Sequence, residues 1–189
     1  MNEAEEYYKS VERNSWHWLD SSEKLKISSE VIYKELNSLL EILRTERTFA
    51  DEEKIMALWG SYYLLVGHSF ENLVKGLSIE NNRLAKNFEE IFKKWGKNGH
   101  QISKIAEQNI PLLTKEEIRI IEKLECYIVW AGRFNLPKDS DIYAKERHNL
   151  FYYTNDYDTI NKLYERTKEM LELAYYKNEK ENPHQLKQG

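Results

Sequence analysis

The sequence feature that most restricts the fold is a long helical pattern between about residues 51 and 79. Apolar residues recur there at steps of three and four, as they do along one side of an α-helix. Those that fall within one arc of the helical wheel are Ile55, Leu58, Trp59, Tyr62, Leu65, Val66, Phe70, Leu73 and Leu77. Because Met56, Leu64 and Val74 lie outside that arc, the pattern predicts a central helix that is packed on more than one side.

Shorter helical patterns occupy most of the remaining chain. Together with the central helix, the predicted helices lie at about residues 3–19, 23–44, 51–79, 83–95, 100–110, 114–133 and 157–176. The sequence leaves open whether Asp20-Ser21-Ser22 separates the first two or lies within one long helix. Residues 135–156 are predicted to form a long connection with at most a short helical turn.

Local end signals accompany several of these helices. Asp51 is a predicted N-cap, because acidic residues occupy the turn that follows it. Gly96 and Gly99 are predicted to supply left-handed turns between two short helices. Thr114 and Glu117 have the spacing of a capping box. The Ile and Val residues that follow also suit a strand, but the length of the segment and its spacing favour a helix.

The small number of turn-forming residues favours an all-α fold. Seven Gly and three Pro are few for 189 residues, and this scarcity favours long uninterrupted elements. We therefore predict an all-α helical bundle of five to seven helices. It is predicted to form a single domain over residues 1–178, followed by a flexible polar tail at 179–189.

The composition of the chain indicates its cellular compartment and the kinds of partner it can bind. Cys126 is its one cysteine, so no intramolecular disulfide is possible, and we expect a cytoplasmic protein. The chain starts with acidic residues, unlike a secretory leader, and no apolar run reaches the roughly 20 residues that cross a bilayer. A net charge of −4 argues against strong non-specific nucleic-acid binding, although it is compatible with a local basic site. The five Trp and thirteen Tyr suit core or subunit-interface positions, with a base-stacking platform as the alternative.

Several well-known site motifs are missing from the sequence. It has no glycine-rich phosphate loop after a strand, no HExxH and no cysteine pair for a metal cage. The five histidines are scattered, and no two have the spacing of metal ligands on a helix. The sequence therefore predicts neither a metal site nor a cofactor.

A polar stripe interrupts the central helix. His68, Glu71 and Lys75 follow one another at three and four residues, so their side chains stack on one side of it. One interpretation is a solvated strip with a favourable Glu71–Lys75 pair. The other is a polar seam that faces another polar helix end, where His68 titrates near neutral pH.

Two charged residues mark the helix predicted at 114–133. Arg133 stands at its C-terminal end, where a cation is favoured by the helix dipole, and the same guanidinium is also a candidate site residue. Glu125 falls on the apolar arc of this helix, so its carboxylate needs a partner or a shifted pKa. We expect a structural pairing for Glu125.

Other candidate binding residues lie outside the helix cores. His100 is expected to help start its short helix, with a site role as the alternative. Arg147 and His148 are adjacent in the long connection, which also carries Lys138 and Lys145. These cations suit either a solvated loop or a phosphate contact.

With these residues placed, the sequence resembles the HEPN superfamily of small α-helical bundles. Three pieces carry the resemblance in order: "GHSFENLVKGLSI", "GHQISKIAEQ" and "YIVWAGRFNLPK". They are similar to the family's E-x-x-x-K-x-L segment, its Gly-His-x-hydrophobic start and its Arg-containing "RYP"-type helix end. The resemblance covers about residues 60–138, and it implies an up-and-down HEPN-like core at about 51–176 with extra helices at both ends.

The resemblance also implies a chemistry and a partner. Active HEPN proteins are metal-independent ribonucleases that pair as homodimers, with an Arg-x(4–6)-His motif from each subunit in a shared cleft. Histidine moves protons between the ribose and the leaving oxygen, while arginine stabilises charge on the phosphorane. Arg133 matches the family's arginine, and Glu71 matches its polar residue on the preceding long helix.

This chain departs from the family where the histidine should stand, because residues 138–140 read Lys-Asp-Ser. We therefore expect a non-catalytic module of a toxin–antitoxin or defence-type system that binds RNA, a nucleotide or a cognate protein. One alternative is a ribonuclease that combines Arg133 and Glu71 with His68 or His148, outside the usual spacing. A second is a helical scaffold with no site, in which the polar stripe fixes helix register.

Overall fold

The computed structural model describes residues 2–83, 88–96, 99–132 and 137–181 of the chain. Within these ranges it contains eight α-helices, a π-helical turn and a 3-10 turn, and no strand. In chain order the elements are α1 (Glu3–Arg13), α2 (Ser15–Glu41), α3 (Phe49–Asn81), α4 (Phe88–Lys94), α5 (Ile102–Asn109), α6 (Lys115–Cys126), η1 (Tyr127–Ala131), α7 (Ser140–Glu146), η2 (Arg147–Leu150) and α8 (Asp156–Glu181). The all-α fold class is confirmed, whereas the predicted number of five to seven helices is too low.

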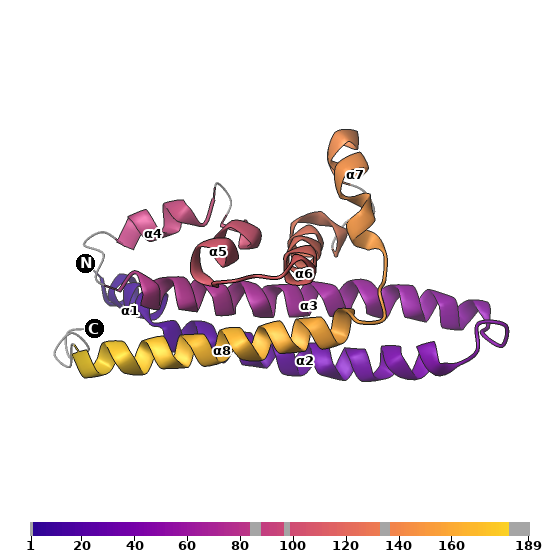
Figure 1. The fold of residues 1–189 in the computed structure, drawn as a ribbon, viewed down its shortest axis with the longest axis horizontal. Helices are drawn as coiled ribbons and strands as arrows, with labels where there is room; N and C mark the ends of the chain where they lie inside the picture. The colour runs from indigo at the N-terminus through magenta and orange to yellow at the C-terminus, as the bar shows by residue number, and fades with distance from the viewer. Residues whose placement is uncertain (1, 84–87, 97–98, 133–136, 182–189) are drawn as a thin grey trace.

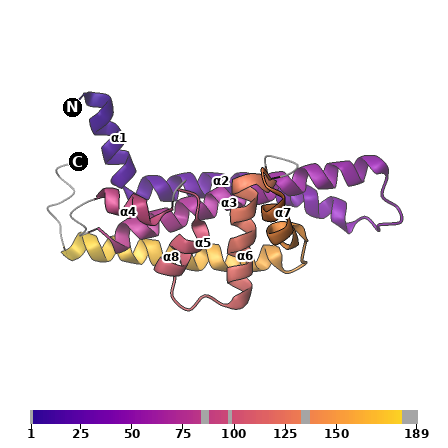
Figure 2. The same ribbon diagram turned by 90° about the horizontal axis from the view of Figure 1, so that it is seen from above.

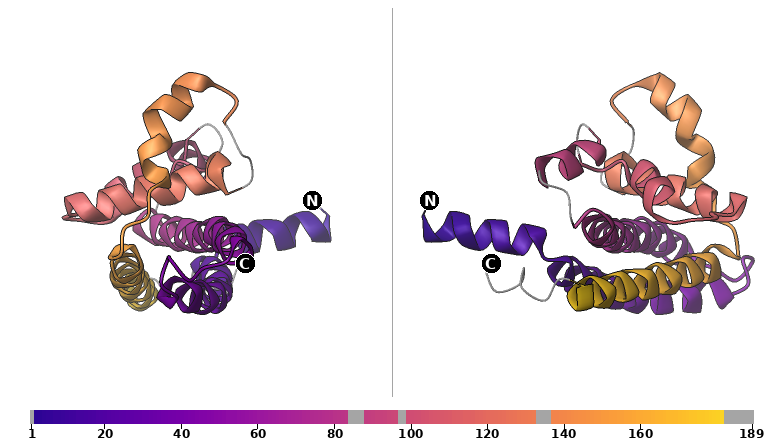
Figure 3. Two further views of the ribbon diagram at one scale, coloured as in Figure 1. Left: turned by 90° about the vertical axis from the view of Figure 1, so that its right-hand side faces the viewer. Right: turned by 60° about the vertical axis from the view of Figure 1, so that its left-hand side comes forward.

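Three long helices form the base of the molecule. α2 and α3 run antiparallel, and α8 lies alongside both, so the three rods form a triangle when they are seen end-on (Figures 1 and 3). The elements from α4 to α7 lie on the opposite side of α3, and α6 crosses over it (Figure 2). α1 leaves the body near the N-terminus and buries none of its side chains (Figure 2).

Local capping chemistry explains two differences from the sequence prediction at the N-terminal end. Asn14 is extended and its side chain accepts a hydrogen bond from the Trp16 amide, so the first break falls there. Residues 20–22 lie inside α2, where Ser22 is buried and donates a hydrogen bond to the Ser69 carbonyl of α3. The central helix is capped by Thr48 and not by Asp51, which instead completes a capping box as its third residue.

The other helices also differ in extent from the prediction. α6 ends at Cys126, and the chain continues as a π-helical turn that ends before Gly132. The predicted Thr114–Glu117 capping box is present at the start of α6. α7 occupies part of the predicted connection, because Asp139 caps it by accepting a hydrogen bond from the Asp141 amide. α8 extends to Glu181, so the first three residues of the predicted tail are helical, and residues 182–189 lie outside the described part.

α3 is the centre of the fold, as its pattern predicts. All its residues from Val66 to Glu80 are buried except His68 and Asn72, so it is packed on several sides. α6 crosses it at Gly67, where a Cβ atom would stand 3.0 Å from Cγ1 of Ile128 and 3.2 Å from the Leu124 carbonyl. The absence of a side chain at Gly67 therefore allows this close approach.

The aromatic residues serve mainly as core. Trp95 and Trp130 are buried, while Trp16, Trp18 and Trp59 pack partly buried against the main cluster. The core interpretation is therefore confirmed for all five tryptophans. No described helix is long and apolar enough to cross a membrane.

Candidate functional site

The candidate site is centred on the carboxylate of Glu71, whose side chain is 3% exposed in the middle of α3. One oxygen, Oε1, lies 2.7 Å from Nζ of Lys75 and 2.7 Å from Nδ1 of His100. The other, Oε2, lies 3.0 Å from Nδ1 of His68. A single buried carboxylate thus holds three nitrogen-bearing side chains, and we call these four residues the Glu71 cluster.

Helical spacing places three members of the cluster. His68, Glu71 and Lys75 lie at three- and four-residue steps on α3, so their side chains occupy neighbouring positions on its surface. Because Glu71 and Lys75 are buried, the interpretation of this stripe as a solvated strip is wrong. The alternative, a polar seam, describes the observed packing.

His100 reaches the cluster from the turn before α5. Gly99 has a φ of +70°, a conformation that favours glycine, and the chain then enters α5, which packs on α3. The prediction that His100 helps start this helix is wrong. α5 is capped at Gln101 without a side-chain hydrogen bond, and the imidazole of His100 instead contacts Glu71.

The surroundings keep Glu71 ionised. Burial raises the pKa of this carboxyl, but the hydrogen bond from His68 and the charge and hydrogen bond of Lys75 lower it to about 2. Lys75 is itself accommodated between two indole rings, with Nζ 5.6 Å from the Trp18 ring centroid and 5.2 Å from that of Trp95. The buried charge pair is therefore well compensated.

The ionised carboxylate fixes the tautomer of both histidines. Because it can only accept hydrogen bonds, Nδ1 donates in each ring, and Nε2 of each neutral imidazole keeps its lone pair. The side chains of His68 and His100 are 33% and 43% exposed, and their ring centroids lie 6.4 Å apart. The cluster therefore presents two solvent-accessible bases on a buried anionic support.

Arg133 lies outside the described residues, together with residues 134–136. The described chain stops at Gly132, where a Cβ atom would stand 2.9 Å from Cβ of Leu64 on α3. Leu64 is about one helical turn before His68. Gly132 thus packs against α3 at Leu64, and the role of Arg133 stays a prediction.

The remaining predicted residues lie apart from the Glu71 cluster. Lys138, Arg147 and His148 are exposed, and His148 bonds through Nδ1 to the Lys145 carbonyl oxygen at 2.9 Å. Among the described contacts, none joins these three residues to Glu71. The structural pairing expected for Glu125 is confirmed, because its Oε2 accepts a hydrogen bond from the Ser103 amide of α5 at 2.8 Å.

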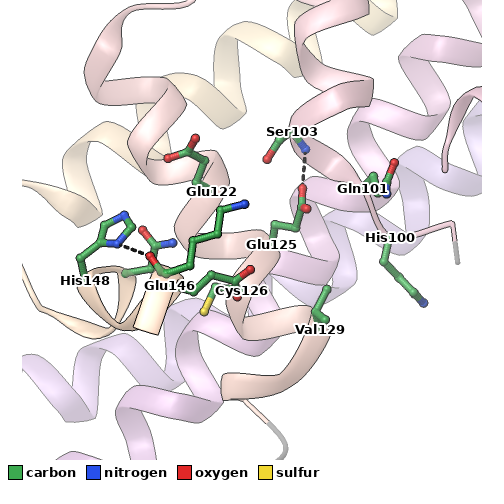
Figure 4. Close-up of a pocket in the computed structure, with 11 residues that line it drawn as sticks. His100, Gln101, Ser103, Glu122, Glu125, Cys126, Val129, Glu146 and His148 are labelled. Atoms are coloured by element: carbon green, nitrogen blue, oxygen red, sulfur yellow. Dashed lines mark hydrogen bonds between the residues drawn. The ribbon is translucent and has the colours of Figure 1, made fainter. Parts of the chain in front are cut away.

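A cavity of about 450 Å³ adjoins the cluster and shares His100 with it (Figure 4). It lies between the start of α5, the outer surface of α6 and the α7–η2 segment. Cys126 also lines it, but burial raises the pKa of this thiol to about 12, so it is a poor nucleophile at neutral pH. Among the described residues, no group of three or more His, Cys, Asp and Glu side chains is arranged to hold a metal ion.

A second buried cluster is absent from the sequence prediction. Asp156, the first residue of α8, accepts hydrogen bonds from Lys123 at 2.7 Å, from Tyr63 at 2.8 Å and from Arg119. Lys123 also donates to the Phe151 carbonyl oxygen and lies 4.2 Å from the Tyr63 ring centroid. Asp156 and Lys123 are both fully buried, while Arg119 is 23% exposed, and the cluster joins α3, α6 and α8.

Comparison of the chain with protein-family models, with curated proteins and with solved structures found no match.

Proposed function

We propose that this protein is a metal-independent ribonuclease of HEPN-like architecture, in which His68 and His100 exchange protons with the substrate. The observation that carries the proposal is the binding of two half-exposed imidazoles through Nδ1 to one ionised carboxylate. This arrangement leaves Nε2 of each ring for proton transfer. The resemblance to HEPN ribonucleases supports the choice of RNA as the substrate.

The reaction follows from the two protonation states of an imidazole. One neutral histidine takes the proton of a ribose 2′-OH at Nε2, and the 2′ oxygen attacks the adjacent phosphorus. The other histidine, protonated, gives its Nε2 proton to the 5′ oxygen as the P–O5′ bond breaks. The products are a 2′,3′-cyclic phosphate and a free 5′-OH. The ring centroids lie 6.4 Å apart, so both imidazoles lie beside the same part of the surface.

Glu71 and Arg133 have supporting roles in this proposal. Glu71 holds both rings in one tautomer and stabilises whichever imidazole is protonated. Arg133 is assigned, by its match to the family motif, to the charge that grows on the phosphorane oxygens. Lys75 is too buried to reach a substrate and serves to keep Glu71 ionised.

A second candidate function is a non-catalytic binding or regulatory module, which the sequence at 138–140 favours. Where active relatives carry histidine, Asp139 caps α7 through a hydrogen bond with the Asp141 amide. This segment therefore starts a helix with no imidazole. In such a module the Glu71 cluster would bind a nucleotide or a protein partner without cleaving RNA.

Cleavage of labelled RNA by the purified protein distinguishes the two functions. We expect cleavage that survives a chelator, is lost in His68→Ala and in His100→Ala, and is strongly reduced in Arg133→Ala. His17→Ala is the matched control, since His17 is an exposed histidine of α2 outside the cluster. Absence of cleavage, or equal cleavage by all these variants, would overturn the ribonuclease proposal.

The resemblance further implies a homodimer that acts in a toxin–antitoxin or defence-type system. Light scattering on the full chain tests the dimer, with a mass of twice 22.7 kDa as the expected result. A monomeric mass at micromolar concentration would contradict it.

A further inference from the structure

The cavity beside His100 has the size and the lining of a ligand site. Its volume of about 450 Å³ falls in the range of small-molecule pockets, roughly 300–1,000 Å³. Figure 4 shows His148 and Glu146 at one side of it and Gln101 and His100 at the other. Glu125 and Cys126 lie between them.

One buried side chain in this cavity lacks a partner. Asn149 lines it from η2 and is only 6% exposed, yet its Oδ1 has no hydrogen-bond partner among the described residues. Buried side-chain oxygens in native proteins nearly always accept a hydrogen bond. Because this oxygen is itself buried, it does not face the cavity, and it says nothing about what the cavity binds.

The lining of the cavity combines carboxylates with side chains that can donate hydrogen bonds. Glu122, Glu125 and Glu146 contribute three carboxylates. Glu125 accepts a hydrogen bond from the Ser103 amide, and Glu146 accepts from the Trp130 indole and the Cys126 thiol, whereas Glu122 has no partner among the described hydrogen bonds. Lys145 adds an ammonium group to the same lining. The cavity thus offers several acceptors and one strong cationic donor.

We propose that this cavity binds a guanine base of the RNA, a proposal that rests on the proposed ribonuclease function. Guanine carries adjacent N1–H and N2–H donors, which match the two oxygens of a carboxylate, and its O6 and N7 accept hydrogen bonds from a lysine. Adenine, cytosine and uracil lack this pair of adjacent N–H donors.

The position of the cavity connects base recognition to the Glu71 cluster. His100 lines the cavity and also bonds to Glu71, and its ring lies 6.4 Å from that of His68. A nucleotide whose base occupies the cavity therefore has its phosphate near the two imidazoles. This arrangement selects phosphodiester bonds next to guanosine.

Direct binding tests the proposal without requiring cleavage. In calorimetric titrations of the full chain, guanosine 3′-monophosphate should bind at least about tenfold more tightly than the adenosine, cytidine and uridine 3′-monophosphates, because one bidentate contact discriminates on this scale. Glu122→Gln and Lys145→Ala should reduce this preference to about threefold or less. Glu165→Gln on α8 is the matched control, since this exposed glutamate lies away from the cavity, and it should keep the preference.

The outcomes separate this proposal from the proposed function. Equal binding of the four nucleotides, or a preference that both cavity variants retain, overturns guanine recognition. Cleavage of RNA without preference for guanosine also overturns it, while the ribonuclease function stands. Guanine-selective binding without any cleavage supports the cavity assignment and overturns the ribonuclease function.

Discussion

Two of the buried carboxylates among the described residues, Glu71 and Asp156, are held in different ways. Asp156 accepts hydrogen bonds from Lys123, Arg119 and Tyr63. None of these partners is a histidine, the side chain that ordinarily changes its charge near neutral pH. Glu71 has one permanent cation, Lys75, and two histidines that reach the surface. Although burial raises the pKa of Asp156, hydrogen bonds from Lys123 and Arg119 lower it overall. Both residues are therefore ionised, but only Glu71 is connected to solvent by groups that can carry protons.

This difference shows how a buried charge can serve structure or chemistry. A carboxylate held by lysine, arginine and tyrosine side chains fixes the positions of helices, as Asp156 does for α3, α6 and α8. A carboxylate whose partners are half-exposed imidazoles can orient them toward a substrate. The chemistry of the partners, and not the burial of the carboxylate, distinguishes the two cases, because only Glu71 is paired with imidazoles.

The largest expected effect is the loss of stability when Asp156 is replaced by alanine. Asp156→Ala leaves the fully buried Lys123 without its counter-ion, and we expect the free energy of unfolding to fall by about 3–5 kcal/mol. Urea denaturation followed by circular dichroism measures this loss. Asp158→Ala, an exposed aspartate in the first turn of the same helix, is the control. A loss below about 1 kcal/mol would show that this pair does not hold the helices together.

Acid should destabilise the protein through Glu71. Its pKa falls from the ordinary 4.5 to about 2 on folding, so the native state binds the proton less well than the unfolded state. The resulting stability, roughly 3 kcal/mol, is present above pH 5 and is lost as the pH falls toward 2. In Glu71→Gln this part of the pH dependence should disappear, while the contribution of Asp156 remains. Identical acid-unfolding curves for the two proteins would contradict the lowered pKa.

The crossing of α6 over α3 can be tested at Gly67. Gly67→Val places side-chain atoms against Ile128 and the Leu124 carbonyl, and we expect a loss of about 1–3 kcal/mol in the free energy of unfolding. Gly60→Ala on the same helix is the control, because a Cβ there has no atom within 4 Å and should stabilise the protein slightly. Thermal unfolding of both variants measures the contrast. A Gly67→Val protein as stable as Gly60→Ala would show that the two helices do not meet closely at this point.

The smallest expected effect on stability comes from the histidines. His68→Ala or His100→Ala removes one hydrogen bond of a half-exposed side chain, so each should cost only about 0.5–1.5 kcal/mol while RNA cleavage is lost. Denaturation and cleavage measured on the same samples provide the check. A loss as large as that of Asp156→Ala would make the two carboxylate sites equivalent and would remove the proposed distinction.

Features that depend on neighbours in the chain were predictable from the sequence. The spacing of His68, Glu71 and Lys75 puts them on one side of a helix wherever that helix packs. The capping box of Thr114 with Glu117 depends on four consecutive residues, and it forms as predicted. The cap at Thr48 has the same spacing with Asp51 in place of a glutamate, whereas the prediction placed the cap at Asp51 because acidic residues follow it.

Features that depend on distant residues required the tertiary structure. Lys123 and Asp156 are 33 residues apart, and the one available signal was a lysine among Ile120, Ile121 and Leu124 on the apolar arc of its helix. His100 was expected to cap its own helix, because nothing local shows that α5 packs on α3 beside Glu71. Helix packing determines which side chains lie beside a buried charge, and a local sequence pattern does not show how the helices pack.

The sequence by itself determined that the chain is all-α, where most helices lie and which polar side chains interrupt them. These properties follow from helical periodicity and from hydrogen bonds within a few residues. Only the tertiary structure decided that the polar stripe is buried and that His100 joins it. The burial of a charged group and the choice of its partner depend on which helices pack together. α6 and the turn before α5 pack on α3 although they are far from it in the sequence, and helical periodicity gives no information about such distant contacts.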